Sequence, residues 1–357
     1  MEPDPASVGD VARLDVPGAG AVEVCLPVVA DTIAHELRAG TYELPTAARL
    51  VLELVIPGAR VLDLGAHLGT VALSAAARGA QVIAVEASPR NARCLGASVQ
   101  RNRFHALTVE NVAVGDREGS VRFHEAGPYG RVATDVDADA VDVPMTRAVS
   151  LVEAHGWDGV DVVKIDVEGY ELAVLEGLQP LLRTVAPPPV VFEVNRHVLG
   201  ARGIEPADVV GAFARLGYHT YFVGDGVLLP AGEDTFQPET VADYLAVAPG
   251  RALPWPVRRA ATTEDLGARI AAEAQSPLPE ARAALAGALV LAPRALLALR
   301  DVERALEALS MDPDDAVATA ASWWPAWRQA RAARNGPDAA IVDGWRALAD
   351  AANALTR

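Results

Sequence analysis

The sequence predicts an α/β fold with a doubly wound, mostly parallel sheet, followed by an appended all-α region. Three observations support this prediction. An apolar run at 61–64 leads into two glycines, Gly65 and Gly69, and then into a helix-forming run at 71–77. Beyond this helix, apolar runs typical of buried strands alternate with helical patterns, which favours parallel strands with helices on both faces. Residues 257–357 carry alanine-rich helical patterns and no strand-like run.

The elements before the glycine turn are predicted from capping and turn signals. Gly40 follows a segment with helical spacing and is a typical helix stop, and Pro57 with Gly58 interrupts the next helical pattern. The predicted elements are a loose tail at 1–18, an edge strand at 21–26, and helices at 31–38 and 45–55. The chain therefore divides into an N-terminal extension at 1–40, a main domain at 41–236 and a helical C-terminal domain at 257–357.

The elements after the glycine turn follow the alternation of a doubly wound sheet. Ser88 and Pro89 start a helix, with serine as the N-cap and proline at the first position. The β-branched run at 160–166 is typical of a strand buried on both faces. The predicted strands are 61–64, 81–86, 107–111, 160–166 and 189–194, followed by a closing hairpin at 218–222 and 227–229. The predicted helices are 71–77, 88–103, 149–155, one that ends near 177, and 207–216. Short strands and loops are predicted between 119 and 143.

The glycine turn is the first candidate binding site. Strand, glycine turn and helix open a nucleotide-binding βαβ unit, in which glycine lets a ligand approach the backbone and the helix N-terminus offers unpaired N–H groups. The spacing is G-x-x-x-G, and Asp63 just before Gly65 would repel a pyrophosphate. S-adenosylmethionine carries a sulfonium and an ammonium and suits this arrangement better. Glu86, at the end of the next strand, is placed to bind ribose hydroxyls.

Polar side chains stand at the carboxyl ends of the predicted strands, where doubly wound sheets bind ligands. They are Asp63, Glu86, Asn111, Asp166 and Glu193. Buried acidic groups are costly unless a ligand, a cation or a metal meets them. Any one of these residues could instead cap a helix or pair with an arginine, but the five together predict a site.

A second cluster lies around the strand at 160–166. Lys164 and Asp166 are two residues apart, so they project from one face of the strand, and Lys164 would pair with a carboxylate or reach into the cleft. Glu168 follows directly, and His197 lies on the same rim after the next strand. These groups would orient a hydroxyl or take its proton, with capping and one buried ion pair as the structural alternative. The candidate catalytic residues are Lys164, Asp166, Glu168, Glu193 and His197; if a divalent metal binds, its ligands would be Asp166, Glu168 and Glu193.

The composition disfavours several classes of partner. The net charge is -16 at pH 7, which would repel the phosphates of a nucleic acid. The longest apolar run, at 283–292, is too short to cross a bilayer, and the acidic N-terminus does not resemble a signal peptide. Cys25 and Cys94 lie far apart in sequence, which fits a reducing compartment. We therefore expect a cytoplasmic protein that acts on a small molecule, without nucleic-acid or membrane partners.

Several motifs, in this order, resemble the FkbM-type S-adenosylmethionine-dependent methyltransferases, a family with the class I methyltransferase fold. They are Gly40-Thr41-Tyr42-Glu43, the segments 61–69 and 85–89, and, most diagnostic, Lys164-Ile165-Asp166-Val167-Glu168-Gly169-Tyr170-Glu171 with 174–177. The resemblance covers about residues 40–229. It implies a Rossmann-like sheet of seven strands. It also implies methyl transfer to a hydroxyl of a small molecule, often a sugar, a polyketide or another secondary metabolite.

The resemblance also implies roles for single residues. Asp63, Gly65 and Gly69 would shape the methionine side of the cofactor site, Glu86 would hold the ribose, and Asn111 would lie near the adenine. The cofactor-binding set implied in this way is Glu43, Asp63, Gly65, Ala66, His67, Gly69, Glu86, Ala87, Asn111 and Asp166. The family usually has asparagine where this chain has His67, which leaves the contact at that position open.

Other functions fit the sequence less well. A base-directed N-methyltransferase usually carries Asn/Asp-Pro-Pro-Tyr/Phe where this chain has Asp166-Val167-Glu168-Gly169, and the glycine spacing disfavours a nicotinamide dehydrogenase. The alternative from another class is a non-catalytic methyltransferase-like module that scaffolds partners through its C-terminal helices. The clustered tryptophans at 323–327 support it, because tryptophan is enriched at interfaces. The same helices would serve a homo-oligomer.

Overall fold

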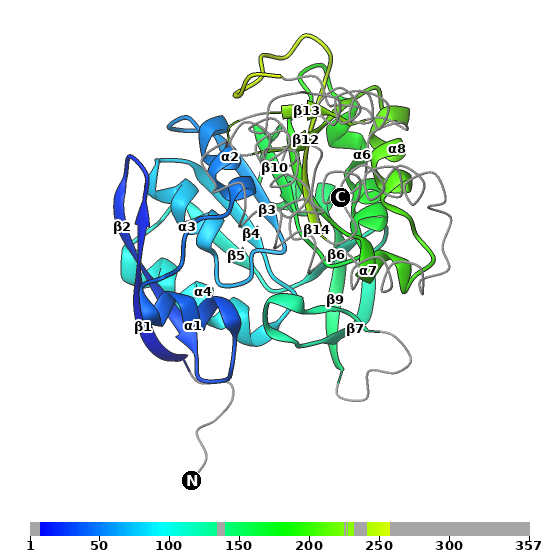
Figure 1. Ribbon diagram of the computed structural model, residues 1–357. Coiled ribbons are helices and arrows are strands. Elements are labelled where there is room, and N and C mark those ends of the chain that lie inside the picture. The colour runs from blue at the N-terminus through cyan, green and yellow to red at the C-terminus, as the bar shows by residue number, and fades with distance from the viewer. Residues whose placement is uncertain (1–7, 134–139, 225, 227, 232–240, 258–357) are drawn as a thin grey trace, which may run out of the picture. The chain divides into compact units, whose positions relative to one another are not determined.

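The computed structural model of the chain describes residues 8–133, 140–224, 226, 228–231 and 241–257 (Figure 1). Within helices and strands, the side chains of His197 and Leu229 are not described. The helical domain predicted at 257–357 lies outside these residues, except for Val257.

The centre of the fold is an eight-stranded sheet with the order β13-β12-β14-β11-β10-β3-β4-β5 (Figure 1). Pairing is parallel from β5 through β4, β3 and β10 to β11, whereas β14 is antiparallel to both of its neighbours. All strands except β13 and β14 therefore run in one direction. The strands are β3 Arg60–Leu64, β4 Gln81–Val85, β5 Leu107–Glu110, β10 Val162–Ile165, β11 Val190–Asn195, β12 His219–Val223, β13 Leu228–Pro230 and β14 Val241–Val247.

The predicted doubly wound, mostly parallel sheet is confirmed, but it has eight strands where seven were expected. The closing hairpin is present, with Val223 opposite Leu228. The strand that no sequence pattern predicted is β14, which lies beyond residue 236 and enters the sheet between β11 and β12. Asp243 interrupts its apolar run and its alanines favour helix over strand, so the strand signal is weak.

Helices cover both faces of this sheet (Figure 1). The helices of the first half pack together on one side, where α2 contacts α3, and those of the second half on the other, where α6 contacts α5 and α8. The first group is α2 Thr46–Leu54, α3 Thr70–Ala77 and α4 Pro89–Asn102; the second is α5 Ala148–Ala154, α6 Glu171–Leu182 and α8 Pro206–Arg215, with the short α7 Arg196–Gly200 after β11.

The capping signals mark helix ends as predicted. The side chain of Ser88 accepts a hydrogen bond from the amide of Asn91 at the start of α4, where Pro89 is the first helical residue. The helix α1 (Thr32–Ala39) ends at Gly40, which has the left-handed φ of 68°. Its N-cap is Asp31, whose Oδ1 lies 2.8 Å from the amide nitrogen of Ala34.

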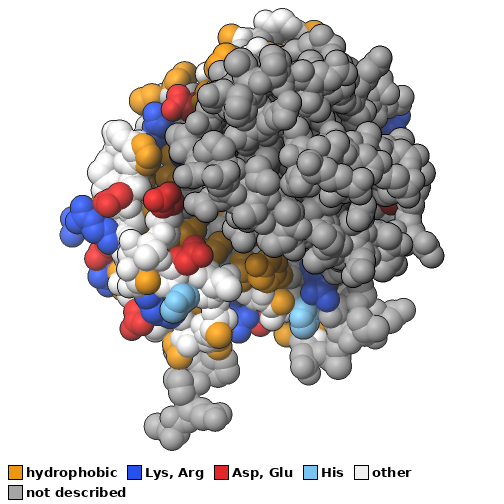
Figure 2. All heavy atoms as spheres, viewed as in Figure 1, with side chains coloured by type: hydrophobic (Ala, Val, Ile, Leu, Met, Phe, Trp, Pro, Cys, Tyr) orange, Lys and Arg blue, Asp and Glu red, His pale blue; other side chains and the backbone are white. Residues whose placement is uncertain are grey.

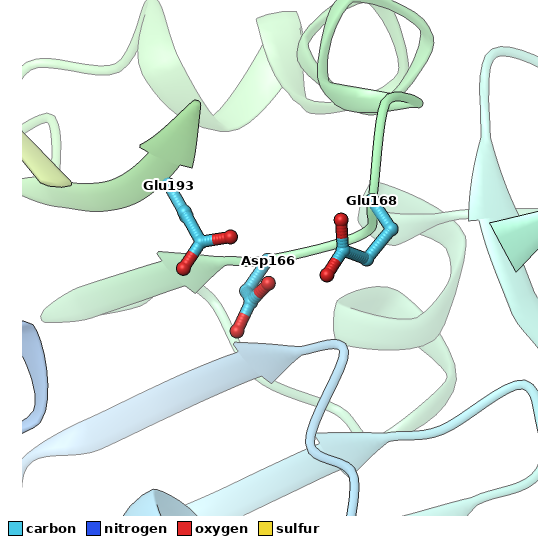
Figure 3. A group of neighbouring side chains, drawn as sticks. All are labelled: Asp166, Glu168 and Glu193. Atoms are coloured by element: carbon cyan, nitrogen blue, oxygen red, sulfur yellow. The ribbon is translucent and has the colours of Figure 1, made fainter. Parts of the chain in front are cut away.

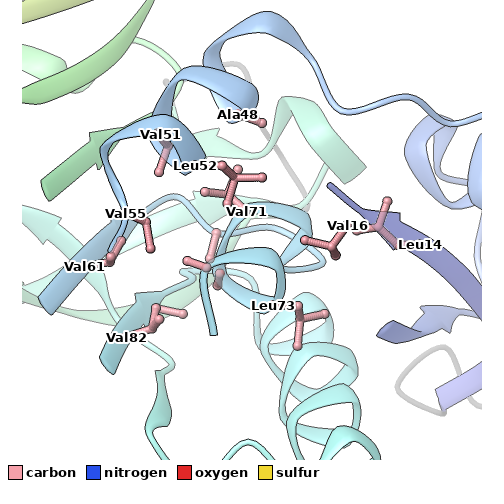
Figure 4. Close-up of a cluster of buried hydrophobic side chains, with 14 of the residues drawn as sticks. Leu14, Val16, Ala48, Val51, Leu52, Val55, Val61, Val71, Leu73 and Val82 are labelled. Carbon is pink, nitrogen blue, oxygen red and sulfur yellow. The ribbon is translucent and has the colours of Figure 1, made fainter. Parts of the chain in front are cut away.

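Residues 8–27 form a β-hairpin, so the prediction of a loose tail at 1–18 was wrong from residue 8 onwards; residues 1–7 lie outside the described part of the chain. The strand β1 (Val8–Val16) pairs antiparallel with β2 (Gly20–Pro27). Leu14 and Val16 of β1 are buried in the same core as Val71 and Leu73 of α3 (Figure 4). The apolar residues at 12, 14 and 16 alternate with exposed ones, which is the period of a half-buried strand and outweighs the nearby turn residues.

A second sheet of four strands has the order β6-β9-β7-β8. It confirms the short strands expected between 119 and 143, and the short helix η1 (Gly127–Tyr129) contacts α1. The strands are β6 Ala113–Gly115, β7 Gly119–His124, β8 Arg131–Val132 and β9 Val141–Arg147.

No helix among the described residues is both long enough and apolar enough to cross a bilayer. On the face drawn in Figure 2, acidic and basic side chains are interspersed over the described surface and do not form one continuous basic patch.

Candidate functional site

One pocket lies at the carboxyl ends of β3, β4 and β10. Its walls come from the glycine turn, the end of β4, the segment before β6, the short helix η1 and the turn after β10. Of the predicted site residues, it brings together Gly65, His67, Glu86, Ala87, Asp166 and Glu168. The complete lining is Ile33, Gly65, His67, Val85, Glu86, Ala87, Val112, Ala113, Val114, Phe123, Gly127, Pro128, Gly130, Val132, Asp166, Val167, Glu168 and Tyr170.

The two glycines of the turn are required by contacts within the protein. Both have positive φ, 81° at Gly65 and 82° at Gly69. A Cβ at Gly65 would lie 1.7 Å from the carbonyl oxygen of Asp166, and one at Gly69 would lie 2.1 Å from Leu95 Cδ1. The glycine turn was expected to admit a ligand at these positions, but neighbouring protein atoms occupy the space of both missing side chains. Gly65 still lines the pocket through its backbone.

Glu86 is held in place by backbone amides. Its Oε2 accepts a hydrogen bond from the amide of His67 at 2.7 Å, and its Oε1 accepts one from the amide of Ser88 at 2.8 Å. The residue is 6% exposed, and burial raises the pKa of its carboxyl group, against the lowering effects of His67 and Ser88. Each carboxylate oxygen can accept a second hydrogen bond, so Glu86 is able to bind hydroxyls of a ligand in the pocket.

Asn111 and Ala66 support this region from outside the pocket lining. The Asn111 side chain is exposed, and its Nδ2 donates to the carbonyl oxygens of Glu86 at 2.9 Å and Ala87 at 3.2 Å. The amide of Ala66 donates to the carbonyl of Val85 at 2.9 Å. Both residues therefore fix the backbone after β3 and β4, and neither lines the pocket.

Lys164 forms a buried ion-pair network with Asp63 and Asp166. Its Nζ lies 3.4 Å from Asp63 Oδ1 and 3.1 Å from Asp166 Oδ2, and it donates to the carbonyl oxygen of Gly65 at 2.8 Å. Burial alone would lower the pKa of Lys164, but the two carboxylates raise it well above its usual value. Lys164 therefore joins β10, the glycine turn and β3, and neither Asp63 nor Lys164 lines the pocket.

Asp166, Glu168 and Glu193 lie together at the ends of β10 and β11 (Figure 3). One carboxylate oxygen from each lies within 4.8 Å of the others. Burial, the negative charge of Asp166 and that of Glu171 raise the pKa of Glu168 to about 7. Burial and the charges of Asp166, Asp243 and Glu168 also raise the pKa of Glu193. The structure therefore brings together the three residues predicted as ligands of a divalent metal.

Two residues around the site, Asn195 and Asp31, were missed by the sequence reasoning, whereas Glu171 was part of the motif at 164–171. Asn195 donates from Nδ2 to Glu168 Oε2 at 3.2 Å, and Glu171 Oε1 accepts the amide of Gly169 at 2.9 Å. Asp31 contacts the ring of His67 from outside the main domain. Asn195 could have been found as the residue directly after a predicted strand, whereas the approach of Asp31 depends on tertiary packing.

Two further predicted site residues remain: Glu43 lies in another part of the surface, and the side chain of His197 is not described. Glu43 is exposed and lines a separate hollow with residues of α1, α2 and β1, including Arg13, Leu37 and Arg49. Its neighbour Tyr42 donates to Thr70 Oγ1 at 3.1 Å, at the start of α3. His197 belongs to α7, and the role predicted for its side chain lies outside the described part of the structure.

The pocket fits a nucleoside ligand and the three carboxylates fit a divalent cation by their donor chemistry. Glu86 offers buried carboxylate oxygens between two backbone amides, and Asp166 with Glu168 adds acidic groups to the pocket lining that suit a cationic group. Carboxylate oxygens are the ligands that Mg²⁺ and Ca²⁺ take in proteins.

Comparison with solved structures finds distant likenesses to methyltransferases. Precorrin-6y C5,15-methyltransferase from Geobacter metallireducens GS-15 is 12% identical with a TM-score of 0.35, and the match covers 62% of this chain and 93% of that one. A TehB-like SAM-dependent methyltransferase from Corynebacterium glutamicum is 14% identical with a TM-score of 0.36, covering 60% and 93%. The bifunctional kinase-methyltransferase WbdD is 17% identical with a TM-score of 0.40, covering 64% and 45%.

Comparison with curated proteins finds no match. Comparison with protein families matches residues 63–220 to the methyltransferase FkbM domain. The match begins at Asp63 in β3, just before the glycine turn, and contains Glu86, Lys164, Asp166 and Glu168, which are central to the site above. Residues 63–220 therefore form an FkbM-family methyltransferase domain.

Proposed function

We propose that the protein transfers a methyl group from S-adenosylmethionine to a hydroxyl oxygen of a small molecule. The observation that carries the proposal is the meeting of Asp166, Glu168 and Glu193, two of which line the pocket. Methylation of a hydroxyl requires that its proton be removed, and the two glutamates of this cluster, whose pKa values are raised, are able to accept it.

Glu168 is the general base in this proposal. Its pKa of about 7 lies near neutral pH, where a base is both ionised in part and basic enough to take a proton. Asn195 orients the carboxylate through its hydrogen bond to Oε2. As the acceptor oxygen forms its bond to the methyl carbon, the carbon–sulfur bond breaks with its electron pair passing to sulfur, and the hydroxyl proton passes to Glu168.

The methyl donor would be held by the part of the pocket that the glycine turn and the end of β4 form. S-adenosylmethionine supplies an electrophilic methyl group on a positively charged sulfur. Glu86 would accept hydrogen bonds from the ribose, and the backbone of Gly65 and Ala87 would line the nucleoside part of the site. Asp166 would favour the positive charge, and Lys164 would hold that carboxylate in place.

The same methyl transfer could also use a divalent cation bound by Asp166, Glu168 and Glu193, which we call the metal form of the proposal. The hydroxyl of an alcohol is a weak acid, and a bound cation lowers the pKa of an oxygen that it contacts. In this form the three carboxylates are ligands and the acceptor hydroxyl loses its proton more easily. His197, on α7 after β11, stays a predicted base of the site as an alternative to the metal.

The first test is transfer of labelled methyl from S-adenosylmethionine into a metabolite extract of the source organism, with and without a chelator. Label in an ether of a small molecule would support the proposal, and label on nitrogen or on nucleic acid would contradict it. Activity lost in the chelator and restored by Mg²⁺ would favour the metal form, whereas full activity in the chelator would rule it out.

Variants make this test specific to the site. Glu168→Gln removes the base and is expected to abolish most transfer, and Glu176→Gln changes an exposed glutamate on α6 and serves as the matched control. Equal activity of the two variants would remove Glu168 from the mechanism. A protein that does not bind S-adenosylhomocysteine in a calorimeter would favour the non-catalytic scaffold, whose C-terminal helices lie outside the described residues.

A further inference from the structure

Asp31 is a buried carboxylate that lies outside the segment matching the FkbM family. Its side chain is 1% exposed, although it belongs to the loop between the N-terminal hairpin and α1. Its Oδ1 caps α1 by accepting the amide of Ala34, and its Oδ2 lies 2.9 Å from Nε2 of His67. One carboxylate therefore joins the N-terminal segment to the glycine turn.

His67 has a demanding position in that turn. Its φ is 52°, in the left-handed region that residues with a Cβ adopt at a cost. Its amide donates to Glu86, and its side chain lines the pocket. The contact between Asp31 and the ring therefore fixes the conformation of the residue whose amide holds Glu86 in place.

The short helix η1, which forms part of the pocket, also lies close to Asp31. A Cβ at Gly127, in η1, would lie 2.9 Å from Asp31 Oδ2, so the backbone of η1 passes close to the carboxylate. Gly127 lines the pocket, as does Ile33 in the first turn of α1. The start of α1, the glycine turn and η1 thus converge on one buried side chain.

Contacts with His67 and with backbone amides stabilise the negative charge of Asp31. Burial alone would raise the pKa of Asp31, but the hydrogen bond and charge of His67, together with the amides of Ala34 and Ile33, lower it overall. Asp31 is therefore ionised at neutral pH and holds the imidazole with a charge-assisted hydrogen bond, which is stronger than a neutral one.

We propose that Asp31 is a positioning residue for the methyl donor. By holding the His67 ring it sets the glycine turn and, through the His67 amide, the carboxylate of Glu86. The N-terminal segment before the family domain is then part of the donor site. This inference rests on the assignment of the pocket to S-adenosylmethionine. It assigns Asp31 to binding of the methyl donor. A change at Asp31 should therefore leave proton removal from the acceptor by Glu168 unaffected.

The test is calorimetric titration with S-adenosylhomocysteine, together with the KM for S-adenosylmethionine. Asp31→Asn keeps a side chain that caps helices well and removes the charge that holds His67. We expect about tenfold weaker binding, the equivalent of one charge-assisted hydrogen bond, with a raised KM and nearly unchanged kcat. The matched control is Asp10→Asn, which removes an exposed aspartate paired with Arg38 in the same segment.

A double-variant comparison separates positioning from general loss of structure. If Asp31 acts through His67, the variant carrying Asp31→Asn and His67→Asn will bind no more weakly than His67→Asn alone. The inference would be overturned if the losses of affinity for S-adenosylhomocysteine in the two single variants multiplied in the double variant. It would also be overturned if Asp31→Asn bound with the affinity of the unaltered protein. If Asp31→Asn does not fold, Asp31→Ser, a capping residue too short to reach the ring, replaces it. Failure of the unaltered protein to bind S-adenosylhomocysteine would instead refute the donor site itself, and the inference with it.

Discussion

The ammonium of Lys164 lies 3.4 Å from the carboxylate of Asp63, a residue that is 0% exposed. The two residues are direct partners in the parallel pairing of β10 with β3. Neither oxygen of Asp63 makes a hydrogen bond among the described residues, and burial raises the pKa of its carboxyl group, an effect that Lys164 opposes. The ion pair therefore fixes the centre of the sheet directly below the pocket.

Removing the cation of this pair should destabilise the whole domain. Lys164→Met leaves Asp63 buried without a counter-charge, and we expect it to lower the free energy of unfolding by about 3 kcal/mol. Asp63→Asn added to Lys164→Met should restore part of this loss. Urea unfolding followed by circular dichroism measures both. Arg13→Met, in an exposed pair with Asp15, is the control and should cost less than about 1 kcal/mol. Equal losses in the two single variants would contradict the structural role.

The stability of the domain should fall as the pH rises from 5 to 8. Burial raises the pKa of Glu171 from 4.5 to about 7. Between these values the folded protein keeps a proton that the unfolded chain releases, so stability is full below pH 4.5 and is lost as the pH rises through 7. Glu171→Gln should flatten this slope and stabilise the protein at pH 8 by on the order of 2 kcal/mol. Scanning calorimetry across this range is the measurement, and parallel pH profiles for the two proteins would refute it.

The rate of methyl transfer should rise with pH and level off above about pH 7. Glu168 must be ionised to accept the proton, and its pKa is raised to about 7. The midpoint of kcat against pH should therefore lie near this value. Glu171→Gln removes one of the charges that raise the pKa of Glu168, so it should move the midpoint to lower pH. A profile that does not respond to Glu171→Gln would argue against Glu168 as the base.

Two glycine variants should separate close packing from backbone conformation. Gly65 and Gly58 both have positive φ, 81° and 86°, but a Cβ at Gly58 would meet nothing within 4 Å. Gly58→Ala should therefore cost about 1 kcal/mol, the price of a left-handed alanine. Gly65→Ala adds a clash with the Asp166 carbonyl and should cost several times more, with loss of S-adenosylhomocysteine binding. Thermal unfolding and calorimetric titration of both variants would show a difference; similar values would mean that the turn tolerates a Cβ.

Glu86→Gln should weaken donor binding without unfolding the protein. An amide has one oxygen and so accepts from only one of the two backbone donors, His67 and Ser88, that Glu86 now satisfies. We expect about tenfold weaker binding of S-adenosylhomocysteine. Glu53→Gln, on the exposed side of α2, should bind like the unaltered protein. Unchanged affinity in Glu86→Gln would remove Glu86 from the donor site.

The sequence predicted the parts of the fold that local chemistry determines. A few neighbouring residues determine the Ser88 cap, the Gly40 helix end and the apolar strands of the parallel core. The structure confirms all three. The strands β1 and β14 were missed because their burial is decided by distant partners, α3 for β1 and β11 for β14.

The site divides in the same way. Asp166 and Glu168 were predicted to lie at the end of a central strand, and the pocket brings them opposite Glu86. Gly65 was expected to let a ligand approach the backbone, and it does line the pocket. The carbonyl of Asp166 would also clash with a Cβ there, a contact that spacing in a sequence cannot indicate. Asp31 could not be predicted, since 36 residues separate it from His67.

The position of β14 also determines when the protein can fold during synthesis. Among the described strands, β12 joins the rest of the central sheet through β14, and β14 is the last of them to leave the ribosome. Until Val247 has emerged, the β12–β13 hairpin has no partner and β11 is an open edge, which is a surface prone to aggregation. A stop codon just after residue 236 would make this transient state permanent, although every residue matched by the family domain would be present.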